Sequence, residues 1–483
     1  MNQELLSRRR RGRLLLRWAF ALGLAALHGV PVAAPPLDAQ ALLQDLSQFR
    51  TAFLDRDRAL AGEARREAES RLQGLTARAG TLDRVELGLE LARIAALADN
   101  GHSLVLLGPL LDQSNRVPIR LTVFEGQFHV VRARQAHAGL LGGRLLAIDD
   151  IPLERLRQTA HALVGGVAAR RDRQAPPLLE SPHMLHALGL VTHPASARYR
   201  VELDTGAVVE QRLVAEEPAA TRPRASTERL LLPEVTPAQD GWLTALGAAD
   251  APWSLRDALS RFRWRDDARL DALVVELRQT FDASGQRLQD FFAQVHEALA
   301  ARPRSHLVLD LRLNGGGDLT KARDFVEDLP RRVPGRIVVL TSPWTFSAAI
   351  SLAGYLKQAA PERVRIVGEA VGDRLVFFAE GKVVALANTG IRFLPATERH
   401  DYLEGCRAHH DCHGNVVRRP IAVASLAPDV AAPWTYDAWH AGRDPAMVAV
   451  ERLLEPAGPA PGACNRPASG AAATSAPPGT PCR

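Results

Sequence analysis

The stretch His306–Lys357 constrains the fold more than any other part of this 483-residue chain. It holds two short apolar runs, Leu307–Leu313 and Ile337–Leu340, and a helical pattern follows each of them. Apolar runs that alternate with helical patterns predict parallel strands joined by crossover helices. In such sheets, ligands bind beyond the carboxyl ends of the strands. The fold class is therefore α/β, and the two strand ends in this stretch are the expected place for a site.

A glycine-rich turn, Asn314–Gly317, follows the first of these strands. The turn contains neither GxGxxG nor GxxxxGK[ST], so a nucleotide-binding loop is not expected. Consecutive glycines instead leave backbone N–H groups free to point into a cleft, which suits the oxyanion of an acyl transfer. The alternative is a tight turn that another part of the backbone approaches closely.

Ser347 follows the second strand, at the point where the chain enters the next helix. A serine at a helix N-terminus is often a cap, which is the structural alternative. Because neighbouring parallel strands end at one edge of a sheet, its hydroxyl and the glycine turn are expected to share a site.

The motifs Asp310–Gly317, Thr345–Ala349 and Val367–Glu369, in this order, resemble the tail-specific (C-terminal-processing) serine peptidases. The resemblance extends over most of residues 90–450. It implies a crotonase-like β/α catalytic domain, preceded by a helical N-terminal unit and a PDZ-like module.

The resemblance also implies an activity and roles for individual residues. Ser347 would be the nucleophile of a serine-type peptidase, and its substrate would be a polypeptide. The backbone N–H groups of Gly315, Gly316 and Ala348 would stabilise the oxyanion. The alternative function is a catalytically inactive relative that uses the same fold to bind peptides or a small apolar ligand.

A catalytic serine needs a base. One branch of the family takes it from a lysine after the serine, but the matching segment here, Gly368–Arg374, contains no lysine. The only lysines of the chain are Lys321, Lys357 and Lys382. None of them suits the role by position, so a Ser–Lys dyad is not expected.

The other branch, which resembles tricorn core proteases, takes its base from a histidine far upstream. His102, in the segment Asp99–Ser103, matches that position loosely, with one extra residue between the aspartate and the histidine. Histidine is well suited to act as a base near neutral pH. The alternative is a surface histidine at a helix end, where Gly101 supplies the left-handed cap. Glu369 and Glu380 are the two candidates for the carboxylate that orients the imidazole.

Positive charge is concentrated at the N-terminus. Residues 1–34 hold six arginines and one acidic residue, or +5 of the formal net charge of +6, so no basic patch remains to indicate nucleic acid as a partner. The same segment has a basic start, an apolar run (Trp18–Leu27) and the small residues Val32–Ala34, which together predict a cleaved secretory signal. We expect a periplasmic or secreted protein, with a membrane anchor only if the segment is retained.

Composition and pattern divide the rest of the chain into five segments. Residues 104–200 resemble a PDZ-like module, which would bind a peptide at a sheet edge. The others are a helical unit (35–103), a hairpin and connector (201–269), the catalytic domain (270–454) and a disordered tail (455–483).

The cysteines lie near the C-terminus, and Cys406 and Cys412 form a close pair of the kind that predicts a disulfide in an exported protein. Histidines between and beside them are zinc-ligand types, but the spacing matches no zinc pattern. We therefore expect neither a metal nor another cofactor. The sequence does not predict the oligomeric state.

Overall fold

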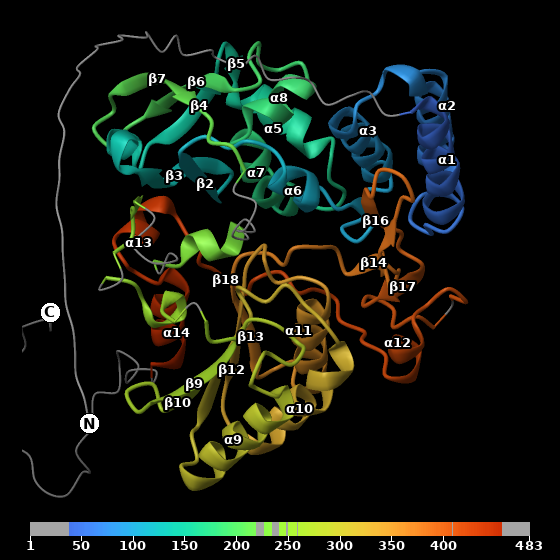
Figure 1. Ribbon diagram of the computed structural model, residues 1–483. Helices are drawn as coiled ribbons and strands as arrows, with labels where there is room; N and C mark the ends of the chain where they lie inside the picture. The colour runs from blue at the N-terminus through green and yellow to red at the C-terminus, as the bar shows by residue number, and fades with distance from the viewer. Residues whose placement is uncertain are drawn as a thin grey trace, which may run out of the picture. The chain divides into compact units, whose positions relative to one another are not determined.

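The computed structural model describes residues 38–218, 227–233, 241–247, 250–257, 259–407 and 409–455. The predicted signal segment and all but the first residue of the predicted tail lie outside these ranges. Within them the chain has a mixed α/β fold with several sheets (Figure 1). None of the described helices has both the length and the apolar character that a membrane span requires.

A six-stranded sheet carries the stretch that begins at His306. Across the sheet the order is β18 (Val430–Ala431), β13 (Val364–Gly368), β12 (Ile337–Thr341), β11 (His306–Asp310), β10 (Ala272–Leu277) and β9 (Phe262–Asp267). All neighbours are parallel except β9, which runs antiparallel to β10. The predicted parallel strands are therefore confirmed. Strand β11 ends at Asp310, short of the predicted Leu313, because the Arg312 amide donates to the Asp310 carboxylate (3.0 Å).

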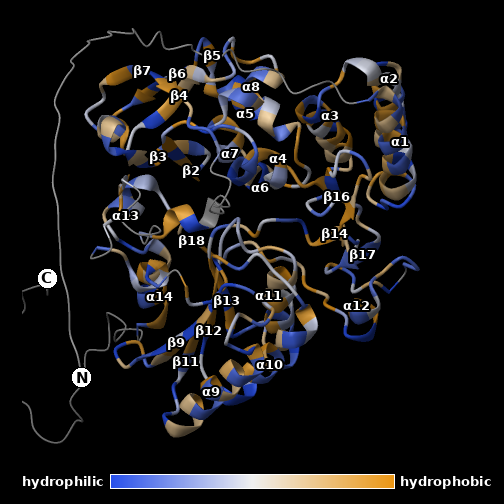
Figure 2. Cartoon of the chain, in the orientation of Figure 1, coloured by the Kyte–Doolittle hydropathy of each residue, from blue (hydrophilic) through white to orange (hydrophobic). Residues whose placement is uncertain are grey.

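Both faces of this sheet are covered. Leu273 and Val275 of β10 face an apolar cluster with the helices α9 (Leu288–Ala301), α10 (Leu319–Arg332) and α11 (Ala348–Ala359). Val274, which points the other way, belongs to a second cluster with α14 (Pro445–Leu454). Figure 2 shows the apolar colour on these strands and on the inner faces of the helices. Burial on both faces explains why the strands have continuous apolar runs instead of an alternating pattern.

A second, seven-stranded antiparallel sheet lies earlier in the chain. Its main path is β2 (Ile119–Phe124), β3 (Gln127–Arg134), β4 (Arg144–Ile148), β6 (Ser196–Glu202) and β7 (Val208–Val214), with β5 (Ile151–Pro152) paired to β4 and β8 (Trp242–Thr244) paired to β3. The helices in this part of the chain are α5 (Leu153–His161), α6 (Ala168–Gln174), α7 (Pro176–Leu179) and α8 (Pro182–Ala187).

The N-terminal unit is helical, as predicted, and it is completed by residues from far along the chain. Its helices are α1 (Ala39–Phe49), which continues as the π-helical turn Arg50–Leu54, α2 (Gly62–Ala77) and α3 (Arg84–Ala96). The strand β1 (Leu104–Val105) pairs with β16 (Arg392–Leu394), and β16 pairs in turn with β15 (Val384–Ala385). The Phe393 ring packs against the ring of Phe49, with 5.0 Å between ring centroids. In Figure 1, the blue helix α1 and the orange strand β16 accordingly lie side by side.

The remaining elements are short. They are α4 (Gly108–Asp112), the strand pair β14 (Val376–Ala379) and β17 (Glu398–Asp401), α12 (Gly414–Arg418), and α13 (Tyr436–His440). At the end of α3, the residue with the left-handed conformation is Asp99 (φ 45°), so the prediction that Gly101 supplies this cap is wrong. An aspartate tolerates that conformation better than most side chains do. Gly101 is needed for another reason, because a Cβ there would lie 2.5 Å from an Asp373 carboxylate oxygen.

Candidate active site

Ser347 stands between β12 and α11 in an uncommon backbone conformation. Its φ is 55° and its ψ is −125°, and its side chain makes no capping hydrogen bond to α11. The interpretation of this serine as a helix cap is therefore wrong. Non-glycine residues rarely adopt positive φ, and holding one in a sparsely populated region costs on the order of 1–3 kcal/mol. The fold therefore holds the backbone of Ser347 in a strained conformation, although the Ser347 hydroxyl does not cap α11.

The turn that leads to Ser347 is tied to the end of β11. Thr345 Oγ1 donates to the Leu311 carbonyl at 2.9 Å. The Phe346 amide donates to the Asn314 carbonyl at 3.0 Å. The strand end that carries the serine and the strand end that carries the glycine turn therefore meet, as the sequence predicted.

Gly316 is the glycine that touches the serine. Its φ is 102°, and a Cβ on it would lie 2.6 Å from Ser347 Cβ, so a larger residue has no room here. Its own amide is engaged, because it donates to Asn314 Oδ1 at 2.9 Å. Among the described residues, the amides of Gly315 and Ala348 donate to no other group. Of the three predicted oxyanion donors, these two are free in this structure.

A buried cluster of ion pairs lies next to the glycine turn in the sequence and joins it to α14. Arg312 pairs with Asp310 and Asp444, each at 2.7 Å, and Ser254 Oγ donates to Asp444 at 2.7 Å. Burial alone would raise the pKa of the Asp444 carboxyl, but the Arg312 guanidinium holds it below its ordinary value. The cluster joins the end of β11 to the start of α14 and so fixes where the turn can lie.

His102 lies between two aromatic rings close to the serine. Its ring stacks on Phe346, the residue before Ser347, with 4.4 Å between centroids, and on Phe377 at 5.2 Å. Neither ring nitrogen makes a hydrogen bond, so the predicted bond to the Ser347 hydroxyl is not formed in this structure. Burial, together with the nearby Arg170 charge, lowers the pKa of His102 well below its ordinary value. The imidazole is therefore neutral at pH 7, which is the form that can accept a proton.

Long-range pairing brings His102 to this place. Asn100 exchanges two hydrogen bonds with the backbone of Phe378 in β14: its Oδ1 accepts from the Phe378 amide at 3.0 Å, and its Nδ2 donates to the Phe378 carbonyl at 3.0 Å. On the other side of His102, β1 pairs with β16. The histidine is held from both sides by segments that lie far from it in the sequence.

The carboxylate beside His102 is that of Asp373, whose Oδ2 lies 3.7 Å from His102 Nδ1. The structure brings neither predicted carboxylate to His102. Glu380 Oε1 lies 3.2 Å from His400 Nε2, and Glu369 lines a different cavity. Burial raises the pKa of Asp373. Asp373 lies in Gly368–Arg374, the segment that lacks the lysine of the other branch, and its acidic side chain is the one signal in the sequence for this role.

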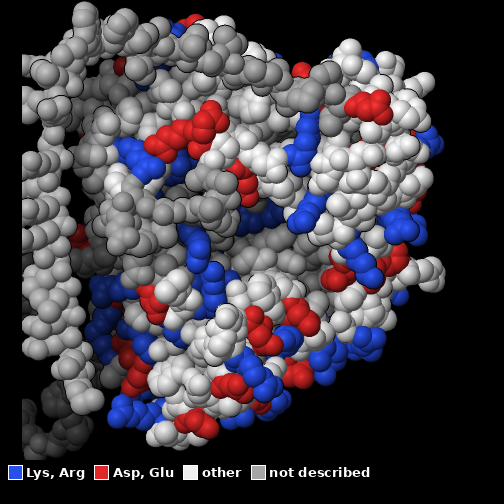
Figure 3. All heavy atoms as spheres, in the orientation of Figure 1, with Lys and Arg blue, Asp and Glu red and all other residues white. Residues whose placement is uncertain are grey.

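A cavity of about 470 Å³ adjoins the glycine turn and the Phe346 ring. Five arginines line it, and we call it the arginine cavity: Arg170, Arg173, Arg229, Arg261 and Arg278. Figure 3 shows basic side chains, in blue, around a hollow near the centre of this face. The arginines come from separate stretches, so the sequence shows no basic run.

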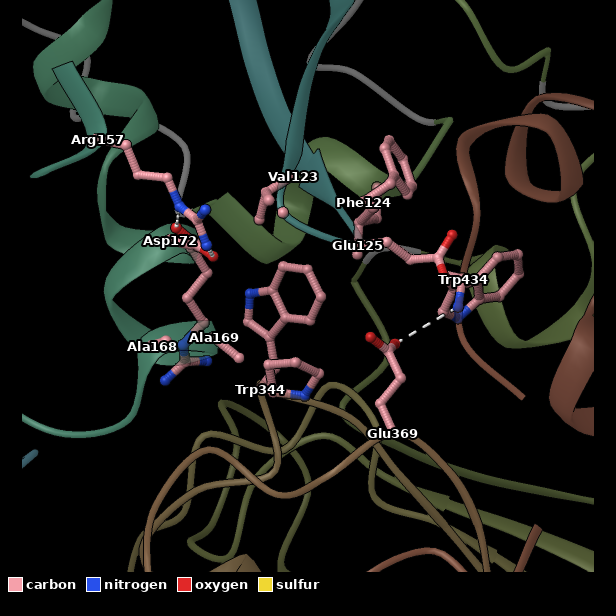
Figure 4. A pocket seen from close by; sticks show the side chains of 14 residues that line it. Val123, Phe124, Glu125, Arg157, Ala168, Ala169, Asp172, Trp344, Glu369 and Trp434 are labelled. Carbon is pink, nitrogen blue, oxygen red and sulfur yellow. Dashed lines mark hydrogen bonds and ion pairs between the residues drawn. The ribbon is translucent and has the colours of Figure 1, made fainter. Parts of the chain in front are cut away.

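A second cavity of about 310 Å³ lies on the other side of Trp344. Figure 4 shows Glu369, Glu125 and Trp434 on one of its sides, and the ion pair of Arg157 with Asp172 on the opposite side. The Glu369 carboxylate accepts one hydrogen bond, from the Trp434 amide at 3.5 Å. Burial raises the pKa of Glu369 to about 7, and the nearby Glu125 charge acts in the same direction.

Cys406 and Cys412 form a disulfide, which confirms that pairing. Their sulfurs are therefore not free thiolate ligands for a metal. The other two cysteines, Cys464 and Cys482, lie outside the described residues.

No protein-family model matches the sequence, and no curated protein matches it. Solved structures do. The chain is similar to mature CPAF, with a TM-score of 0.54 at 14% sequence identity, over 86% of this chain and 96% of that chain. A CPAF mutant with a serine replaced by alanine gives a TM-score of 0.56 at 14% identity, with the same coverage. Mature CPAF complexed with lactacystin gives 0.53 at 15% identity, over 86% of this chain and 98% of that chain.

At this level of identity the likeness establishes the fold. The resemblance to the tail-specific peptidases, drawn from the order of the sequence motifs, is thereby confirmed at the level of the fold. The likeness covers 86% of the chain, so it reaches well beyond the motifs that suggested it.

Proposed function

We propose that this chain is a serine-type peptidase that cleaves polypeptides through an acyl-enzyme, with Ser347 as the nucleophile. One observation carries the proposal: Ser347 has a φ of 55°, its hydroxyl makes no helix-capping bond, and Gly316 leaves room for nothing larger beside it. A structural serine has no need of this strain. The likeness to mature CPAF supports the same activity and does not favour the inactive alternative.

In the first half of the reaction, the Ser347 hydroxyl oxygen attacks the carbonyl carbon of the peptide bond. His102 takes the proton of the hydroxyl, and Asp373 orients the imidazole through Nδ1. The negative charge on the carbonyl oxygen is stabilised by the free amides of Gly315 and Ala348. When the tetrahedral intermediate collapses, the C–N bond breaks and His102 gives its proton to the leaving amine.

In the second half, a water molecule attacks the acyl-enzyme. His102 accepts a proton from the water and returns it to the Ser347 oxygen as the ester bond breaks. His102 must gain a hydrogen bond to Ser347 for either half, and catalytic hydrogen bonds are often long before substrate is bound. The neutral state of the buried imidazole suits the first step, in which it must accept a proton.

The remaining assignments rest on the sequence: the two domains on the family resemblance, and export on the layout of the N-terminal segment. We propose a crotonase-like catalytic domain at 270–454, a PDZ-like module at 104–200, and export to the periplasm or medium by the segment 1–34. The antiparallel sheet with its helix α5 supports the module, and the parallel sheet with α9–α11 supports the catalytic domain.

A fluorophosphonate probe tests the nucleophile directly, because it reacts with activated serines. We expect labelling of the wild type and of Ser70→Ala, an exposed serine in α2 that serves as the matched control. Ser347→Ala should not be labelled, and His102→Ala should be labelled much more slowly. Equal labelling of wild type and Ser347→Ala would refute the assignment. A folded wild type that resists the probe would favour the inactive alternative.

A further inference from the structure

The arginine cavity holds a charge that the proposed catalytic steps do not use. Its five arginines come from four stretches: α6 supplies Arg170 and Arg173, and single residues are supplied by Arg229, Arg261 and Arg278. No aspartate or glutamate among the described residues lines the cavity. One of the five, Arg278, is paired with an acid outside the lining, Glu276, at 3.3 Å. A walled hollow lined by one sign of charge concentrates ligands of the opposite sign.

Two of the arginines serve the structure. Arg278 donates to the carbonyls of Asp257 (2.9 Å) and Ser254 (3.0 Å), so it braces the backbone beside β9. Arg170 donates to the Gly101 carbonyl at 2.8 Å and lies over the Phe346 ring at 3.8 Å. Burial lowers the pKa of Arg170 to about 10 and the nearby Asp373 charge opposes this, so the guanidinium keeps its charge at neutral pH.

Two other arginines of the cavity are available to bind a ligand. Within the part of the chain that the structure describes, the side chains of Arg229 and Arg261 make neither an ion pair nor a hydrogen bond. Both are partly exposed, so their guanidinium groups can reach a ligand. A guanidinium presents a planar fork of N–H groups that matches the two oxygens of a carboxylate.

The position of the cavity limits what its ligand can be. It is bounded by Gly315–Gly317 and by Phe346, which also flank the proposed reacting serine. A polypeptide whose carbonyl lies at Ser347 therefore has a neighbouring residue at the mouth of the cavity. Ligand pockets commonly measure about 300–1,000 Å³, and the 470 Å³ here can hold such a residue.

We propose that the arginine cavity binds a carboxylate of the polypeptide substrate, close to the bond that is cleaved. The proposal rests on the peptidase function proposed above and adds a substrate class to it. The carboxylate is the side chain of an aspartate or glutamate in the substrate. It supplies the negative charge that the described lining of the cavity lacks.

A proteome-derived peptide library, digested with the purified protein and read by mass spectrometry, tests the proposal. Enrichment of aspartate or glutamate at one fixed position beside the cleavage sites supports it. Cleavage without such enrichment overturns the proposal, and so does cleavage that is set only by the distance from peptide C-termini and is lost when those termini are amidated.

Variants then connect the preference to the cavity. For a pair of peptides that differ only in the carboxylate and its amide, Arg261→Gln should lower kcat/KM of the carboxylate peptide by about tenfold to a hundredfold, as expected for a lost charge-assisted hydrogen bond. The amide peptide should change little. Arg261→Glu should reverse the preference. Arg155→Gln, an exposed arginine of α5, is the matched control and should keep it.

The outcomes separate this proposal from the peptidase assignment. Fluorophosphonate labelling of Ser347 reports on the nucleophile alone, so a labelled Arg261→Gln variant shows that the catalytic residues are intact. If the variant is labelled and cleaves both peptides as the wild type does, the proposed role of the cavity is wrong and the peptidase assignment stands. If wild type is not labelled, the peptidase assignment itself fails.

Discussion

Replacing Glu369 by glutamine should change how the stability of the protein depends on pH. This glutamate lines the second cavity, where its carboxylate accepts one hydrogen bond from the Trp434 amide at 3.5 Å. Burial raises its pKa from an ordinary 4.5 to about 7, with a further contribution from the Glu125 charge. A glutamine keeps the shape and the hydrogen-bond acceptor but cannot ionise. The variant therefore isolates the cost of burying this charge.

The sign follows from the protons that each state binds. Between pH 4.5 and about pH 7 the folded state keeps the Glu369 proton while the unfolded chain loses it. The free energy of unfolding of the wild type therefore falls as pH rises through this window, and above it the loss stays constant. One pKa unit corresponds to about 1.4 kcal/mol. A shift from 4.5 to about 7 thus predicts a loss of about 3 kcal/mol that Glu369→Gln does not suffer.

Urea denaturation of both proteins at a series of pH values from 4 to 8 measures this effect. The free energy of unfolding of Glu369→Gln minus that of the wild type should increase by about 3 kcal/mol between the two ends of the series. Glu362→Gln is the matched control, because Glu362 is exposed in the turn before β13. Its curve should run parallel to that of the wild type. A parallel curve for Glu369→Gln as well would refute the reasoning.

Three further substitutions test other parts of the structure. Arg312→Ala should lower the free energy of unfolding by about 3–5 kcal/mol, because it leaves two buried carboxylates unpaired; a loss in urea denaturation below about 1 kcal/mol would contradict this. Asp373→Asn should lower kcat/KM by about 10²–10⁴-fold, because the imidazole of His102 loses its orienting carboxylate; unchanged steady-state kinetics would rule out that role. Cys406→Ser should cost about 2 kcal/mol, as expected for a short loop closed by a disulfide, and this difference from the wild type should vanish in a reducing agent that opens the bond to Cys412.

The sequence alone determined the parts of the fold that depend on local pattern. The strands His306–Asp310 and Ile337–Thr341 lie at the apolar runs Leu307–Leu313 and Ile337–Leu340 that predicted them. The same local signals placed Ser347 after a parallel strand and beside the glycine turn, since neighbouring strands of a parallel sheet end at one edge. The free amides of Gly315 and Ala348 belong to this locally determined half of the site.

The other half was decided by contacts between distant segments, for which the sequence carries no local signal. Asp373, instead of Glu369 or Glu380, lies beside His102, because the pairing of Asn100 with Phe378 determines which carboxylate that loop meets. All three acids lie close together in the sequence, and nothing in their spacing separates them.

The distribution of charge likewise depends in part on the sequence and in part on the tertiary structure. Counted along the chain, the excess of positive charge lies in the N-terminal segment, and the remainder has a net charge close to zero. In the folded chain, α6 and three further stretches bring five arginines to one cavity with no acid among its described lining. Net charge adds without regard to position, whereas the electrostatic potential depends on distance. The sequence therefore placed the proposed nucleophile, Ser347, and only the tertiary structure determined which charges surround it.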